Sequence, residues 1–141
     1  MDNNIDILDR IIIGRVEPHI YAFTTNTVPN YLKVGDTYRP VSKRLKEWKE
    51  FFPELQKQYE NKAIIDEDTY FRDYSIHQYL ESDLEKRRLI PTDLPEGDYY
   101  SKEFFKDTET VDIDSAIEDI KNNYIENTGK YEYYSSNNRL P

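Results

Sequence analysis

An acid and a histidine lie four residues apart in the segment that follows residue 68. Asp73 and His77 share a helical face with Ile76 and Leu80, so both should point inward or into a cleft. A carboxylate beside an imidazole can transfer protons or bind a metal ion. Such a pair is more often a local structural contact, and both interpretations stay open. Because no second histidine lies near His77, the sequence does not predict a zinc site.

One arginine also occupies a position where a charge is costly. Apolar residues recur at helical spacing at Val41, Leu45, Trp48 and Phe52. They predict a helix that begins near Pro40, a favoured first-turn residue, and ends at Pro53. Arg44 projects from the core-facing side of this helix or from its edge. A lone arginine at a helix edge is more often a snorkelling side chain than a functional one.

The remaining elements predict an α/β (α+β) domain. The segments are a helix at 5–13, strands at 19–24, 31–35 and 62–65, a helix capped by Asp68 or Thr69, and a last helix at about 112–127. This order indicates a small three-stranded, mainly antiparallel sheet flanked by helices, with extra N- and C-terminal helices. The tail at 128–141 is polar and rich in tyrosine, and we expect it to be loosely ordered.

Composition excludes several classes of protein. The 141 residues contain no cysteine, which excludes disulfides and thiolate chemistry. No apolar run approaches the roughly 20 residues that cross a bilayer, and the acidic N-terminus is unlike a signal peptide, so we expect a cytoplasmic protein without a membrane partner. The net charge of −9 would repel a polyanion. However, residues 31–50 carry six basic and three acidic side chains, which is compatible with local phosphate binding.

Four blocks of the sequence, read in order, resemble the GIY-YIG nuclease superfamily. They are His19-Ile20-Tyr21, Lys33-Val34-Gly35, Arg44 within a helix, and an acid that opens a second helix. The stretch IYAFTTNTVPNYLKVGDTYRPVSKRLKEW carries most of the resemblance. It is nearest to the bacterial and phage branch in which the second triplet reads Lys-Ile-Gly. FRDYSIHQYL and KEFF are similar to that branch's acid-x-x-x-His helix and Glu-aromatic-Phe strand, so the resemblance covers about residues 18–106.

The sequence departs from the family pattern at three positions. His19 replaces the first glycine, and Lys33 replaces the second motif's tyrosine, as in the branch named above. Asp73 stands where the family usually has a metal-binding glutamate. Aspartate can also bind Mg²⁺ but is one methylene shorter.

The resemblance implies metal-dependent hydrolysis of DNA phosphodiesters, with a role for each matched residue. Arg44 would bind two non-bridging oxygens at once, which a lysine cannot do. Asp73 would hold Mg²⁺ or Mn²⁺ against the phosphate and the leaving 3′ oxygen. Tyr21, helped by Lys33, would orient or deprotonate the attacking water, and His77 would relay protons or contact the phosphate. Sequence-blind backbone contacts would come from Arg39, Lys43 and Lys46.

The sequence therefore leads to two hypotheses about function. The first is a single-domain, metal-dependent DNA endonuclease over residues 1–141, associated or fused with a restriction or helicase module. The second is a catalytically weakened GIY-YIG fold that binds DNA or protein, which the acidic balance and the aspartate at position 73 favour.

Overall fold

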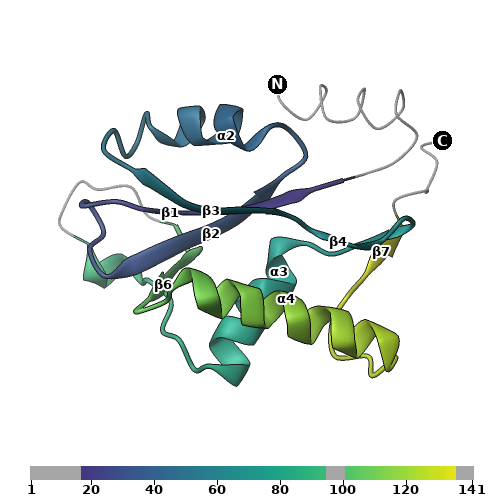
Figure 1. The fold of residues 1–141 in the computed structure, drawn as a ribbon. Coiled ribbons are helices and arrows are strands. Elements are labelled where there is room, and N and C mark those ends of the chain that lie inside the picture. The colour runs from purple at the N-terminus through teal and green to yellow at the C-terminus, as the bar shows by residue number, and fades with distance from the viewer. Residues whose placement is uncertain (1–16, 95–100, 136–141) are drawn as a thin grey trace.

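The computed structural model describes residues 17–94 and 101–135, which form a mixed α+β fold (Figure 1). Its main sheet has the strand order β3-β1-β2-β6, and each neighbouring pair is antiparallel. The strands are β1 (His19–Thr24), β2 (Tyr31–Thr37), β3 (Gln56–Lys62) and β6 (Phe104–Lys106). The α+β class is confirmed at this level, but the main sheet has four strands where the sequence predicted three.

The β1–β2 hairpin places the two motif strands in register. Tyr21 lies opposite Gly35, and Phe23 lies opposite Lys33. Opposed residues of an antiparallel pair share a face, and so do residues two apart along one strand. These four residues therefore all lie on one face of the sheet. The two strands predicted at 19–24 and 31–35 thus pair as antiparallel neighbours, and Tyr21 and Lys33 share a face.

Helix α2 (Val41–Trp48) covers this face of the sheet (Figure 1). An aromatic and aliphatic cluster fills the space between them: Tyr21, Phe23, Val28, Val41, Leu45, Trp48, Phe52, Leu55, Leu89 and Phe104. The predicted helix ended at Pro53, but α2 ends at Trp48 and the chain continues as a turn. Phe52 still packs in the cluster, which is why its spacing resembled another helical turn.

Helices α3 (Asp73–Gln78) and α4 (Thr110–Ile125) lie on the opposite side of the sheet (Figure 1). Residues of β1 and β2 that alternate with Tyr21 and Lys33, including Ile20 and Val34, pack there against Ile76 and Ile120. A π-helical turn, η1 (Tyr79–Asp83), extends α3, and a short 3-10 helix, η2 (Pro91–Asp93), precedes β6. The predicted C-terminal helix at 112–127 is confirmed with a shift of two residues at each end.

A second sheet corrects two predictions for the later part of the chain. Its strands are β4 (Ile64–Asp66), β5 (Thr69–Tyr70) and β7 (Tyr134–Ser135), in the order β4-β5-β7. The single strand predicted at 62–65 is instead divided between β3 and β4. The helix expected from Asp68 or Thr69 begins only at Asp73, because β5 occupies the intervening residues.

The tail predicted to be loosely ordered at 128–141 is ordered over its described residues, 128–135, and residues 136–141 lie outside the described part of the chain. Tyr131 is buried, and Tyr134 stacks on Tyr70 across the β5–β7 pair at a centroid distance of 5.3 Å. Aromatic burial therefore overrides the polar composition of this segment. The helix predicted at 5–13 lies outside the described residues, and no described helix is long and apolar enough to cross a membrane.

Candidate active site

Tyr21 and Lys33 meet beneath α2 with their polar atoms almost in contact. Their side chains are 1% and 0% exposed, and Lys33 Nζ lies 3.5 Å from Tyr21 Oη. Gly35 makes this packing possible. A Cβ atom at position 35 would lie 2.7 Å from Tyr21 Oη and 3.1 Å from Lys33 Nζ. The glycine of the second motif is therefore required by the side chains that flank it.

A carboxylate and an aromatic ring compensate for the burial of Lys33. Glu103 Oε1 lies 2.5 Å from Lys33 Nζ, and the centroid of the Trp48 ring lies 4.0 Å from the same nitrogen. An ammonium group removed from water needs such partners, because its desolvation costs several kcal/mol. Glu103 stands immediately before β6, and its side chain remains 34% exposed, so the ion pair reaches solvent at one end.

Arg44 borders the same cluster from α2. Its guanidinium Cζ lies 5.1 Å from the Trp48 ring centroid, and its Nη1 donates to Glu47 Oε1 at 2.9 Å. Burial lowers the pKa of Arg44, but the hydroxyl of Tyr21 and the carboxylate of Glu47 more than offset burial, and the pKa is raised overall. The side chain is 35% exposed, so Arg44 is the cation of this cluster that a ligand could reach from solvent.

The three predicted backbone-binding residues differ in their environments. Arg39 is buried, and its Nη2 donates to the same Glu47 oxygen at 2.8 Å. Lys43 and Lys46 are exposed on α2. Lys46 also lines a groove of about 520 Å³, together with Ser42, Leu45, Lys49, Leu55 and Lys57. The structure thus makes Lys43 and Lys46 available to a ligand and ties Arg39 to Glu47.

Asp73 opens α3 but is only 4% exposed. Its backbone N–H donates to Asp36 Oδ2 at 2.9 Å, and the Asp36 carboxylate also accepts two hydrogen bonds from Arg72. Burial is the largest cause that raises the pKa of Asp73, to about 8, followed by the negative charges of Asp36 and Glu103. The Asp73 carboxyl group is therefore destabilised as an anion in the protein alone.

His77 is held by the sheet. Its Nε2 lies 2.8 Å from the carbonyl oxygen of Val34, so this nitrogen carries the proton and donates it. The same Nε2 is 3.9 Å from Asp73 Oδ2, and the ring packs on Phe105. Burial lowers the pKa of His77. The imidazole is thus neutral in the interior, where it bonds the backbone of β2.

The predicted site residues form two groups. Tyr21, Lys33 and Arg44 gather around Trp48 on the α2 face, whereas Asp73 and His77 belong to α3 on the other side of the sheet. Glu103 links the two groups. It forms an ion pair with Lys33, and its negative charge also acts on Asp73 and His77, where it favours the protonated form of each.

The fit of a divalent metal depends on Asp73. Mg²⁺ is commonly bound by one or two carboxylates, with water and substrate phosphates completing its coordination. Asp73 supplies the right donor, and the neighbouring charges of Asp36 and Glu103 that raise its pKa would attract a cation. Among the described residues, no group of three or more histidine or acidic side chains forms a ready-made metal cage. Asp73 therefore fits a site that a phosphate would help to complete.

Three residues at this site were not recognised as functional from the sequence. Trp48 was assigned to the apolar stripe of a helix, and the spacing of apolar residues cannot predict its hydrogen bond to Tyr21. Glu103 lies within the KEFF stretch, which offered a signal. Asp36 carried no signal, because its contact with the backbone of Asp73 spans 37 residues of sequence.

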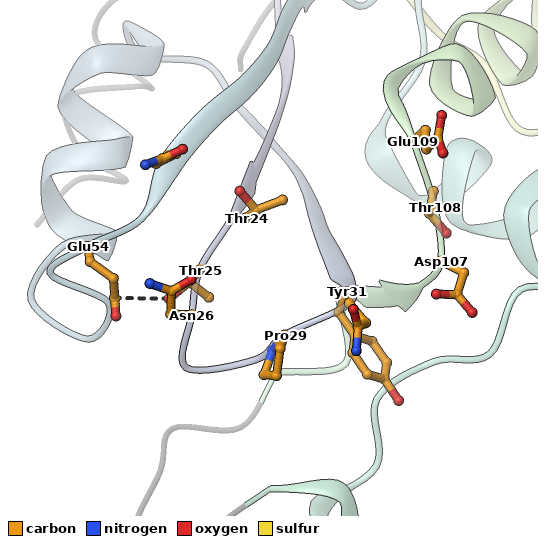
Figure 2. A pocket seen from close by; sticks show the side chains of 11 residues that line it. Thr24, Thr25, Asn26, Pro29, Tyr31, Glu54, Asp107, Thr108 and Glu109 are labelled. Atoms are coloured by element: carbon orange, nitrogen blue, oxygen red, sulfur yellow. Dashed lines mark hydrogen bonds between the residues drawn. The ribbon is translucent and has the colours of Figure 1, made fainter.

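A second hollow lies at the far end of the β1–β2 hairpin (Figure 2). It has a volume of about 500 Å³ and is lined by hydroxyl, amide and carboxylate groups from Thr24, Asn26, Tyr31, Glu54, Asp107 and their neighbours. None of the predicted site residues lines it. Glu54 is already engaged, because its Oε1 accepts a hydrogen bond from the Thr25 hydroxyl at 3.0 Å.

Comparison with known proteins identifies no relative of this chain. No family model matches the chain, and no curated protein or solved structure is significantly similar to it.

Proposed function

We propose that this chain is a GIY-YIG-type DNA endonuclease domain that hydrolyses phosphodiester bonds with Mg²⁺ or Mn²⁺. The observation that carries the proposal is the cluster of Tyr21, Lys33 and Arg44 around Trp48, with Gly35 directly opposite Tyr21. The two motif strands and the helix arginine, far apart in the sequence, thus supply an acceptor oxygen and two cations to one place.

Arg44 is the group that first meets the substrate in this proposal. Its guanidinium is the accessible one, and it can exchange the Glu47 carboxylate for two oxygens of a phosphate. Exchanging one anion for another preserves the charge balance of the partly buried guanidinium. Moving toward the phosphate would also uncover Tyr21, whose oxygen lies close to Arg44 in the interior. The exposed Lys43 and Lys46 would hold the adjoining backbone without reading sequence.

Tyr21 then orients the attacking water, and the proton that this water loses passes to solvent. Its Oη receives a hydrogen bond from Trp48 Nε1 at 2.8 Å and lies near Lys33 Nζ, which also can only donate. These two donors fix the position of the oxygen that orients the water. A metal ion on Asp73 would, when bound, polarise the phosphate and stabilise charge on the leaving oxygen. His77 keeps α3 attached to β2 through Val34 and so positions Asp73.

A catalytically weakened module that binds DNA or protein remains the second candidate function. Two observations favour it. Asp73 lies on the other side of the sheet from Arg44 and is destabilised as an anion, and the chain carries a net charge of −9. A restriction or helicase module as partner and a cytoplasmic location belong to the same proposal.

Nicking of supercoiled plasmid separates the two functions. The purified chain should convert supercoiled to open-circular DNA with Mg²⁺ or Mn²⁺ and not with EDTA, and Arg44→Ala should lose this activity. Metal-independent conversion, or equal conversion by Arg44→Ala, would identify a contaminant. DNA retention without any nicking would leave the binding module as the function.

A further inference from the structure

The single tryptophan of the chain touches all three residues of the proposed catalytic cluster. Its Nε1 donates to Tyr21 Oη at 2.8 Å, and its ring faces Lys33 Nζ at 4.0 Å and Arg44 Cζ at 5.1 Å. These three partners come from β1, β2 and α2. Building on the proposed nuclease function, we infer that Trp48 is a positioning residue that holds Tyr21 and the two cations in catalytic register.

The hydrogen bond from Trp48 determines how the hydroxyl group of Tyr21 is oriented. An indole N–H is a donor without acceptor capacity, and an ammonium group is likewise only a donor. Tyr21 Oη therefore accepts from Trp48 and faces the donor Lys33, so its lone pairs are oriented by fixed groups of the fold. Trp48 thus fixes the position of the Tyr21 hydroxyl that orients the attacking water. A phenylalanine at position 48 would keep a ring but lose this bond.

The ring of Trp48 contacts both cations. Lys33 lies over the indole from the sheet, and Arg44 approaches it from one turn earlier on the same helix. Attraction of each cation to a tryptophan face is worth about 0.5–2 kcal/mol and holds the charge without neutralising it. A carboxylate in this place would pair with the guanidinium and compete with a phosphate. The aromatic contact instead leaves Arg44 free to exchange Glu47 for substrate.

An ordinary core role is the alternative that the experiment must separate. Trp48 also packs against Phe23 and Phe52, with centroid distances of 5.9 and 6.1 Å. Its replacement will therefore lower stability in either case. Phe52→Leu provides a matched control, because Phe52 is fully buried in the same cluster and its ring packs on Trp48 and Phe104.

Steady-state nicking by the full chain tests the role of Trp48. Trp48→Phe should lower kcat about tenfold, the size expected for one lost hydrogen bond at a reacting group, and change KM less than twofold. Phe52→Leu should lower the denaturation midpoint at least as much and keep kcat within twofold. Equal kcat for Trp48→Phe and wild type, or equal losses in both variants, would overturn the inference.

A more conservative replacement covers the case in which Trp48→Phe fails to fold. Because the chain has one tryptophan, an analogue with sulfur in place of the indole N–H can be introduced at this site alone. It keeps the ring system and removes the donor, so it should give the same loss of kcat. Full activity of the analogue would overturn the inference.

The fluorescence of Trp48 distinguishes this inference from the function on which it rests. Duplex DNA added without metal should shift the emission of the wild type, because Arg44 leaves the ring, and Arg44→Ala should not show the shift. Metal-dependent nicking that is unaffected by loss of the indole donor would overturn only the role of Trp48. Wild-type protein that shifts its emission but never nicks would overturn the proposed function and, with it, the catalytic role of Trp48.

Discussion

Gly35 lies directly opposite Tyr21 in the β1–β2 pair, and a Cβ atom at that position would be 2.7 Å from the tyrosine oxygen. Real Cβ atoms essentially never approach another atom this closely. The Cζ atom of Tyr21 would also lie only 2.8 Å away, so the whole ring would have to shift to accept a side chain at position 35. The second-motif glycine thus makes room for the acceptor oxygen of the first motif.

Gly35→Ala should destabilise the fold by about 1–3 kcal/mol, the usual cost of overpacking a core, and should abolish nicking by displacing Tyr21. Urea denaturation measures the first effect. In a Tyr21→Leu background the same substitution should cost at least 1 kcal/mol less, because the clashing atoms are gone. Equal costs in both backgrounds would show that the strand backbone, and not Tyr21, requires glycine.

Arg44→Ala should reduce the rate of nicking about 10²–10³-fold, as found when an electrostatic donor to a transition state is lost. DNA affinity should fall far less, since Lys43 and Lys46 remain exposed on the same helix. Arg44→Lys should recover little of the rate, because an ammonium group cannot bind two oxygens in a plane. Fluorescence anisotropy and plasmid nicking measure the two properties separately. A parallel loss of binding and nicking would assign Arg44 to binding alone.

Lys43→Ala serves as the matched control for this experiment. The residue precedes Arg44 but is exposed on α2, away from the Trp48 ring. Its loss should weaken DNA binding similarly for all sequences and reduce the salt dependence by about one phosphate contact. The nicking rate at saturating DNA should be unchanged.

The stability of the chain should depend on pH through Asp73. Its pKa is raised to about 8 in the folded protein, whereas an unfolded aspartate titrates near 3.9. The folded state therefore binds the proton more tightly, and the contribution of Asp73 to stability is full below about pH 4 and lost as the pH rises toward 8. Asp73→Asn should remove this dependence and stabilise the protein at pH 8–9 by about 1–3 kcal/mol.

His77 changes the stability with pH in the opposite direction to Asp73. The effect of Asp73 must therefore be measured as a difference between two proteins. Its pKa is lowered, so its contribution is full above about pH 6.5 and falls as the pH drops below that value. Urea denaturation of wild type and Asp73→Asn at each pH isolates the effect of Asp73. At pH 8–9, Mg²⁺ should stabilise the wild type and leave Asp73→Asn unchanged. An identical response of both proteins to Mg²⁺ would remove Asp73 as the metal ligand.

Local patterns predicted the hairpin and both long helices because each depends on neighbours in sequence. Composition marked 19–24 and 31–35 as strands, and the register of their pairing puts Tyr21 and Lys33 on one face. The same patterns failed at β5, whose two residues are held by pairing with Ser135 and Tyr134 from the end of the chain. A strand that short has no periodicity of its own, so only the partner makes it recognisable.

The sequence predicted which residues form the candidate site on the α2 face, but not the contacts that those residues make with other parts of the chain. Arg44 was identified because a charge on an apolar stripe violates the local pattern. The partnership of Lys33 with Glu103 joins residues 70 positions apart and no local rule contains it. The placement of Asp73 on α3, across the sheet from α2 and Arg44, is likewise a property of topology that the sequence of neither helix contains.

The ion pair between Lys33 and Glu103 should respond unequally to the loss of either partner. Lys33 is fully buried, whereas Glu103 is 34% exposed. Glu103→Gln leaves a buried ammonium group without its counter-charge, which should cost toward the lower end of about 3–5 kcal/mol, because the remaining amide oxygen and the Trp48 ring still attract it. Lys33→Met should cost less, because the carboxylate of Glu103 can turn to water and the methionine fills the apolar space.

The double variant Lys33→Met/Glu103→Gln completes the test, since it contains neither charge. It should be more stable than Glu103→Gln alone by 1 kcal/mol or more, as expected when an unpaired buried charge is removed. Urea denaturation at pH 7 measures all four proteins. If Glu103→Gln were as stable as the wild type, the carboxylate would not be the group that makes Lys33 tolerable beneath α2. The Trp48 ring and the Tyr21 oxygen would then have to hold the ammonium group by themselves, and substituting Trp48 would become the larger perturbation of stability.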